Sequence, residues 1–100
     1  MSEKRIERIC RVIVRGVGGR MPKWVSPAYV GVPDRVLLIP NSPVVFVEFK
    51  QPGEPLRPAQ AQWEAWLLEN GFDHWVIDDP ADFKRRVEAH VRTHTGQLES

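Results

Sequence analysis

The sequence lacks the features of a secreted or membrane-bound protein. It has one cysteine, Cys10, among 100 residues, so an internal disulfide is excluded. No apolar run approaches the roughly 18 residues that cross a membrane. The first residues, which include Glu3, Lys4 and Arg5, lack the apolar centre of a signal peptide. We therefore expect a cytoplasmic protein with no membrane partner.

Linkers, internal repeats and low-complexity segments are also missing. The length of 100 residues suits one compact domain, and the apolar fraction of 42% and charged fraction of 27% are those of an ordinary globular protein. Cys10 lies within a helical apolar pattern, which favours a buried hydrophobic residue over a reactive thiol. The three histidines do not share a metal-ligand spacing, so a zinc site is not expected.

Net charge is only +1, but it is unevenly distributed. Residues 1–23 carry seven Lys or Arg and two Glu, whereas the rest of the chain carries seven basic and eleven acidic residues. Four of the basic residues recur at helical spacing: Lys4, Arg8, Arg11 and Arg15. This asymmetry fits a polyanion-binding face beside an acidic pocket, and it also fits an ordinary solvated helix.

The periodicity predicts a single α/β domain over residues 1–92, followed by a polar tail over 93–100. Helices are expected over residues 3 to about 16, capped by Ser2, over 58–70, and from Pro80 to about Arg92, with Asp79 as the N-cap. Strands are expected over 21–26, 35–39, 44–50 and 72–77. The predicted order is αβββαβα, a mixed sheet flanked by helices.

Two carboxylates and a lysine, Asp34, Glu48 and Lys50, lie at the two ends of the predicted hairpin of residues 34–50. Side chains alternate along a strand, so Glu48 and Lys50 share one face and the apolar Val45, Val47 and Phe49 share the other. If residues 40–43 form a tight connection, Asp34 lies near Lys50, and Glu48 is about 7 Å away. The alternative is an ion pair between Glu48 and Lys50 on an exposed strand.

Two carboxylates this close repel each other unless a cation lies between them. Mg²⁺ takes oxygen ligands and is commonly held by one or two protein carboxylates, with waters and a phosphate oxygen. A neighbouring lysine can then hold or deprotonate a water, or stabilise charge on a phosphate. The pattern therefore indicates metal-assisted hydrolysis of phosphodiesters.

Pro33-Asp34 and Glu48-Phe49-Lys50 resemble the two halves of the signature of the PD-(D/E)xK nuclease superfamily. An ordered set of further motifs surrounds them: Gly18-Gly19, Trp24-Val25-Ser26-Pro27, Gly31-Val32-Pro33-Asp34-Arg35, Leu56-Arg57-Pro58-Ala59-Gln60 and Gly71-Phe72. With these motifs the sequence is similar to the VRR-NUC family, the virus-type replication and repair nucleases, over roughly residues 3–92.

The resemblance implies a role for each matching residue. Asp34, Glu48 and the backbone carbonyl of Phe49 would hold Mg²⁺, with Mn²⁺ as a substitute, and Lys50 would position or activate the water. Glu7 would be the acid that reaches this site from the first helix, contacting the metal through water. Gln60 would contact the water or the scissile phosphate. The alternatives are that Glu7 pairs with Arg11 one turn away, and that Gln60 is a surface residue like Gln62.

The resemblance also implies a DNA endonuclease acting on branched DNA, in particular four-way junctions, in a bacterial or phage-infected cell. A junction requires two symmetric cuts, so a homodimer is expected, and no organic cofactor. The candidate DNA contacts are Lys4, Arg8, Arg11, Arg15, Lys23 and Arg35. Two alternatives remain: a DNA-binding module of the same fold that does not cut, and a structural domain whose acids form surface pairs.

Overall fold

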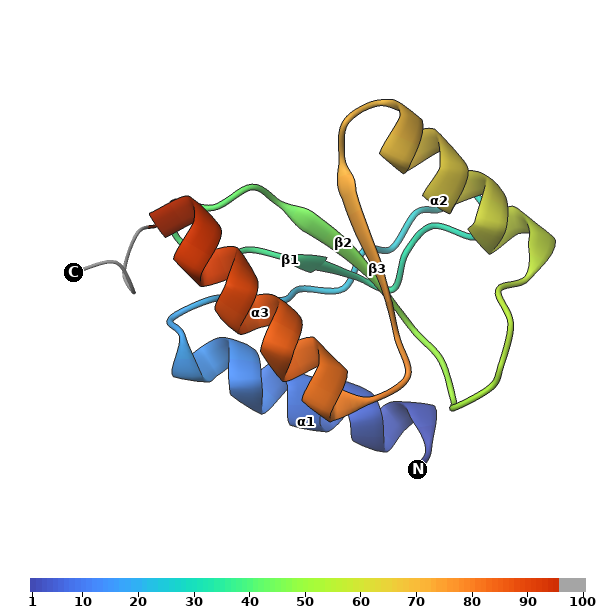
Figure 1. The fold of residues 1–100 in the computed structure, drawn as a ribbon. Coiled ribbons are helices and arrows are strands. Elements are labelled where there is room, and N and C mark those ends of the chain that lie inside the picture. The colour runs from blue at the N-terminus through green and yellow to red at the C-terminus, as the bar shows by residue number, and fades with distance from the viewer. Residues whose placement is uncertain (96–100) are drawn as a thin grey trace.

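Three helices surround a three-stranded mixed sheet in the computed structural model, which describes residues 1–95 (Figure 1). The elements are α1 (Glu3–Gly16), β1 (Arg35–Leu37), β2 (Val45–Phe49), α2 (Pro58–Glu69), β3 (Asp73–Ile77) and α3 (Pro80–Thr95). Strand β2 is central, antiparallel to β1 and parallel to β3. The predicted α/β class is confirmed. Within residues 1–95, no helix is long and apolar enough to cross a membrane.

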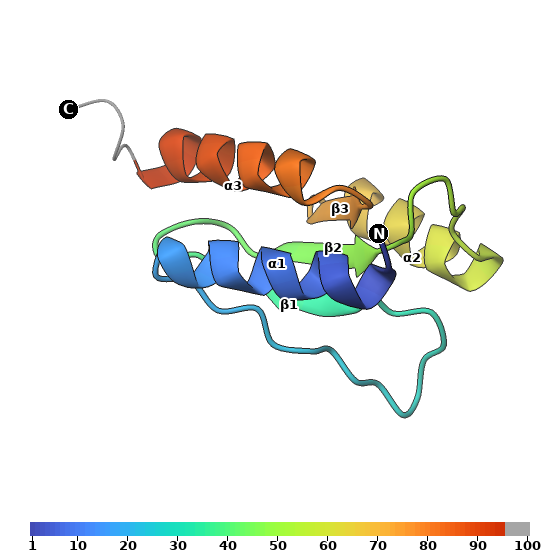
Figure 2. The same ribbon diagram turned by 90° about the horizontal axis from the view of Figure 1, so that it is seen from below.

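Helices α1 and α3 lie against each other and cover one face of the sheet (Figures 1 and 2). The main core forms there, where Val47 and Phe49 of β2 meet Ile6 of α1 and Phe83 of α3. Cys10 is fully buried in the same core, and this burial raises the pKa of its thiol to about 12. The prediction that Cys10 is an inert buried hydrophobic residue is therefore confirmed.

The other face of the sheet carries an aromatic cluster. Phe46 of β2 lies 5.3 Å from Trp24 and 6.0 Å from Phe72 between ring centroids, and Trp24 lies 5.4 Å from Trp63 of α2. Helix α2 lies apart from the α1–α3 pair (Figure 1). Since side chains alternate along β2, Glu48 and Lys50 belong to this second face, as predicted.

Helix boundaries follow local capping. Ser2 accepts a hydrogen bond from the backbone N–H of Arg5, and Asp79 accepts one from the backbone N–H of Ala81. Helix α3 continues to Thr95, so the predicted boundary near Arg92 is too early. The buried His90, whose Nε2 lies 2.9 Å from the Pro43 carbonyl oxygen, attaches the last turns of α3 to the sheet connection. The remainder of the predicted tail, 96–100, lies outside the described residues.

The strand predicted over 21–26 is wrong in detail. The segment runs along the outer edge of β1, but it forms only two isolated bridges, Arg20 with Leu38 and Lys23 with Arg35. Pro22 lies between them and accepts a hydrogen bond from Val36 through its carbonyl, but it has no N–H to donate in return. The missing donor interrupts the ladder, so the order is αββαβα.

Candidate active site

The register of the hairpin determines which side chains meet. Arg35 pairs with Val47 and Leu37 with Val45, so Asp34, one residue before β1, lies opposite Glu48. The Asp34 Oδ2 atom accepts a hydrogen bond of 2.8 Å from the backbone N–H of Phe49. The expected register, in which Glu48 is one residue pair away from Asp34, is therefore wrong. Pairing stops at Leu37 because the connection is longer than predicted and includes Asn41 at a positive φ of 62°.

Glu48 is buried and held by Gln60. Only 2% of Glu48 is exposed, and its Oε1 atom accepts a hydrogen bond of 3.0 Å from Gln60 Nε2. The Oε1 atom of Gln60 in turn accepts a bond of 2.8 Å from the backbone N–H of Arg57, at the start of α2. Gln62 is exposed. The two glutamines therefore differ: Gln60 binds Glu48, whereas Gln62 lies on the surface.

Burial and a neighbouring acid change the protonation of Glu48. Loss of solvent is the largest cause, followed by repulsion from Asp34 and a hydrogen bond with it, and together these raise the pKa of Glu48 to about 8 although Lys50 lowers it. At neutral pH the metal-free protein therefore keeps a proton on Glu48. The carboxyl groups of Asp34 and Glu48 repel each other when both are charged, and either a proton or a cation between them relieves this repulsion.

Lys50 is buried on the same face and is 3% exposed. Its Nζ atom lies 4.0 Å from Glu54 Oε1, at the limit of an ion pair, and Glu54 is exposed. Within residues 1–95, no ion pair joins Lys50 to Glu48. Since both side chains are buried and unpaired with each other, the alternative of an exposed surface ion pair is wrong.

Glu7 reaches toward the sheet from α1 and is bound by Arg35. The Arg35 Nε atom donates to Glu7 Oε1, and its guanidinium also donates to the Met21 carbonyl at 2.7 Å. The partner of Glu7 is therefore Arg35 and not the exposed Arg11. Arg35 is 7% exposed and already engaged, whereas the other predicted DNA contacts are exposed: Lys4, Arg8, Arg11, Arg15 and Lys23.

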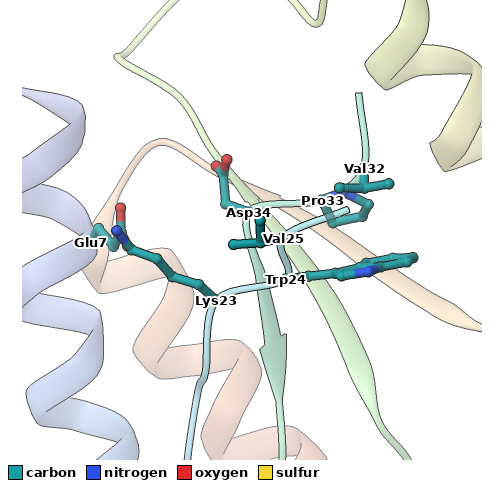
Figure 3. A pocket seen from close by; sticks show the side chains of 7 residues that line it. All are labelled: Glu7, Lys23, Trp24, Val25, Val32, Pro33 and Asp34. Atoms are coloured by element: carbon teal, nitrogen blue, oxygen red, sulfur yellow. The ribbon is translucent and has the colours of Figure 1, made fainter. Parts of the chain in front are cut away.

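A hollow of about 260 Å³ opens beside Asp34. Figure 3 shows Lys23 extending toward Glu7 on one side of this hollow and Trp24 forming the opposite side, with Asp34 between them. The hollow gives solvent access to the acidic residues from the α1 side. It is therefore the entrance through which an anionic substrate could approach Asp34.

Glu3 is an acid near this site that the sequence interpretation did not include. Burial raises the pKa of its carboxyl, and repulsion from Asp34, Glu54 and Glu7 raises it further, while Lys50 lowers it. Glu3 therefore shares an electrostatic environment with Asp34 and Lys50. Its position one helical turn before Glu7 was the available signal, since residues four apart share a helix face.

Gly31 brings the loop before Asp34 against the start of α2. A Cβ atom at this position would lie 2.7 Å from the backbone and Cβ of Ala59, and the backbone has a positive φ of 80°. Only glycine accommodates both conditions without strain. This close packing places Asp34 and Gln60 on the same side of the sheet.

The chemistry of the donors fits a divalent cation of the Mg²⁺ class. Asp34 and Glu48 are adjacent carboxyl groups, and the buried Glu48 is destabilised in its charged form unless a cation compensates. Within residues 1–95, no group of three or more His, Cys, Asp or Glu side chains is arranged to hold a metal. A cation here would therefore depend on two carboxylates supplemented by a backbone carbonyl and water.

Comparison with known proteins identifies the family of this chain. The family model of the VRR-NUC domain matches residues 2–78. The chain is 42% identical over 78 residues to "Putative nuclease p44" of Acyrthosiphon pisum secondary endosymbiont phage 1, covering 78% of this chain and 84% of that protein.

Two solved structures share the fold. One, described as a VRR-NUC domain, has a TM-score of 0.79 at 21% identity and covers 86% of this chain and 94% of its own. The other, described as a VRR-NUC domain protein, has a TM-score of 0.68 at 14% identity and covers 92% of this chain and 89% of its own. The sequence match and the shared fold agree: this chain belongs to the VRR-NUC domain family.

Proposed function

We propose that the protein is a metal-dependent nuclease that hydrolyses phosphodiester bonds in DNA. One observation carries the proposal: Asp34 and Glu48 lie opposite each other at the β1–β2 edge, with the buried Lys50 on the same face as Glu48. Membership of the VRR-NUC family and the similarity to a phage protein named as a nuclease support it.

Each site residue has a role in this proposal. Asp34, Glu48 and the backbone carbonyl of Phe49 would hold Mg²⁺, or Mn²⁺ in its place, and the bound metal would supply Lewis-acid stabilisation of the phosphate charge. The Lys50 ammonium would hold the attacking water or stabilise the phosphate oxygens. Gln60 keeps Glu48 in place through its hydrogen bond. Glu7 and Glu3 would contact the metal through bound water.

The proposed substrate is branched DNA, and the proposed assembly is a homodimer. The exposed cations of α1, together with Lys23, lie on the side from which the hollow beside Asp34 opens, and they suit a phosphate backbone. One chain of this size offers one such site, and two symmetric cuts across a junction require two. A C2 dimer supplies two sites related as the two strands are.

The proposal is tested with synthetic four-way junction, flap, nicked and linear duplex DNA, each incubated with and without Mg²⁺. We expect cleavage that requires the metal and is fastest on branched DNA. If the wild-type protein binds these substrates but cleaves none of them in Mg²⁺ or Mn²⁺, the protein is a non-cleaving DNA-binding module. Cleavage of linear duplex as fast as of junctions would contradict the selectivity alone.

A further inference from the structure

Three hollows follow one another along α1. The first is the hollow beside Asp34. The second, of about 390 Å³, shares Glu7 and Lys23 with the first. The third, of about 510 Å³, shares Arg11 and Arg35 with the second and extends to Arg20. Neighbouring hollows share lining residues, and the three together, here called the α1 groove, follow α1 from Asp34 to the segment after the helix.

The α1 groove is strongly basic. Its exposed cations are Lys4, Arg5, Arg8, Arg11, Arg15, Arg20 and Lys23. Within residues 1–95, none of these side chains has an ion-pair partner. In the described part of the chain, Glu7 is the one acid that lines the second hollow, where the buried Arg35 already binds it, and the third hollow has no acidic lining residue. The groove therefore presents free cations to an anion.

The far hollow is formed by two separate parts of the chain. Arg15 extends from the last turn of α1, and Arg20 follows the turn at Gly18 and Gly19. The bridge between Arg20 and Leu38, with N–O distances of 2.8 Å in both directions, fixes this second part against the edge of the sheet. Arg20 is therefore held beside Arg15, although the sequence interpretation did not include it among the DNA contacts.

The length of the groove limits what it can hold. At a rise of about 1.5 Å per residue, Arg15 lies about 12 Å along the helix axis from Glu7. That distance accommodates about two or three successive phosphates of one strand. Helix α2, on the other side of the site, contains no Lys or Arg and carries Glu64 and Glu69. The cationic track therefore leaves the site toward α1.

We propose that the α1 groove binds the backbone of the cleaved strand on one side of the scissile bond, with Arg15 and Arg20 contacting the outermost phosphate. This inference rests on the proposed nuclease function. The ligand is recognised by its phosphates and not by its bases, so the groove contributes affinity without sequence preference. A strand that fills the groove must therefore extend further on that side of the cut than on the other.

The first test measures binding without cleavage, in EDTA, to a fluorescent single-stranded oligonucleotide at several salt concentrations. The double variant Arg15→Ala/Arg20→Ala is compared with Lys84→Ala/Arg85→Ala, which removes two exposed cations from α3. We expect the first variant to reduce the slope of log affinity against log salt by about 0.7, since the two arginines contact one phosphate and each phosphate contact on a single strand contributes about 0.7. The control variant should match wild type. Equal losses in both variants, or none in the first, would overturn the proposal.

The second test locates the phosphates by ethylation interference on the uncut complex of the Lys50→Ala variant. We expect two or three consecutive phosphates whose ethylation blocks binding, all on one side of the site. In the background of Arg15→Ala/Arg20→Ala, interference at the outermost one should disappear. A symmetric pattern, or one unchanged by the arginine substitutions, refutes the one-sided track. Both tests use binding alone, so a protein that binds in this way but does not cleave would refute the nuclease proposal and not the groove.

Discussion

Gln60 Nε2 donates a hydrogen bond of 3.0 Å to Glu48 Oε1, and this contact links the start of α2 to the centre of the sheet. The Oε1 atom of the same amide is occupied by the backbone N–H of Arg57. Both ends of the Gln60 side chain are therefore engaged, and its orientation is determined. Gln60 acts on the site by positioning Glu48.

Substitution of Gln60 by alanine should weaken metal binding more than it weakens folding. Loss of a group that orients a ligand typically costs about 10- to 100-fold in metal affinity or activity. We expect the Mg²⁺ concentration for half-maximal cleavage to rise by about that factor, with recovery of most of the rate at high Mg²⁺. Gln62→Ala, on the exposed side of α2, is the matched control and should behave as wild type. Equal effects of the two substitutions would refute the positioning role.

Glu48 should make the metal-free protein less stable as pH rises. Its pKa is about 8 in the folded protein against an ordinary value of 4.5, so the folded state binds the proton more tightly than the unfolded state. The stabilisation is complete below about pH 4.5 and is lost as pH rises to about 8. Glu48→Gln resembles the protonated side chain and should remove this loss.

Thermal unfolding of both proteins in EDTA from pH 5 to pH 9 measures the effect. The difference in Tm between Glu48→Gln and wild type should grow with pH in favour of the variant. The subtraction cancels every other titrating group that the two proteins share. A difference that stays constant across this range would mean that Glu48 titrates normally in the folded state.

Divalent metal should stabilise the protein, and more strongly at high pH. Binding to the folded state alone contributes about 2.7 kcal/mol at a metal concentration 100 times the Kd. For a domain of this size, that corresponds to a rise in Tm of roughly 10–20 °C. The metal must displace the proton from Glu48, so the shift with Mn²⁺ should be larger at pH 8.5 than at pH 6.5. Asp34→Asn should abolish the shift, and a variant that keeps it would place the metal elsewhere.

Arg35 should contribute to stability through Glu7. Removal of the guanidinium leaves the partly buried carboxylate and the Met21 carbonyl without their donor, at a cost of about 2–3 kcal/mol. Urea denaturation of Arg35→Ala measures this cost. Arg11→Ala removes an exposed cation from α1 and should leave the free energy of unfolding nearly unchanged. If Arg11→Ala destabilises as much as Arg35→Ala, Glu7 is paired with its helical neighbour in solution.

The sequence was sufficient to predict the elements and faces of the hairpin. Alternation along β2 separates Val47 and Phe49, which enter the core, from Glu48 and Lys50, and this pattern depends only on the strand period. The register was not predictable. It depends on where pairing stops at the turn, and the left-handed Asn41 and two prolines lengthen the connection.

Contacts between residues far apart in the chain could not be predicted from the sequence either. Arg35 lies 28 residues from Glu7, whereas Arg11 is the neighbour that helical periodicity suggests. Gln60 is buried, and the packing of Gly31 against Ala59 at the start of the same helix is a tertiary contact that the sequence pattern does not show. Helical periodicity alone does not distinguish Gln60 from Gln62. The resemblance to the family pointed to Gln60.

The central claim is that Asp34, Glu48 and Lys50 form a metal-dependent phosphodiesterase site. Single-turnover cleavage of a four-way junction in Mg²⁺ tests it most directly, comparing wild type with Asp34→Asn, Glu48→Gln and Lys50→Ala, and with Arg85→Ala as a surface control. We predict loss of at least about 100-fold in rate for each of the three site variants. The control should keep the wild-type rate. Cleavage at the wild-type rate by folded Lys50→Ala and Glu48→Gln proteins would contradict the account.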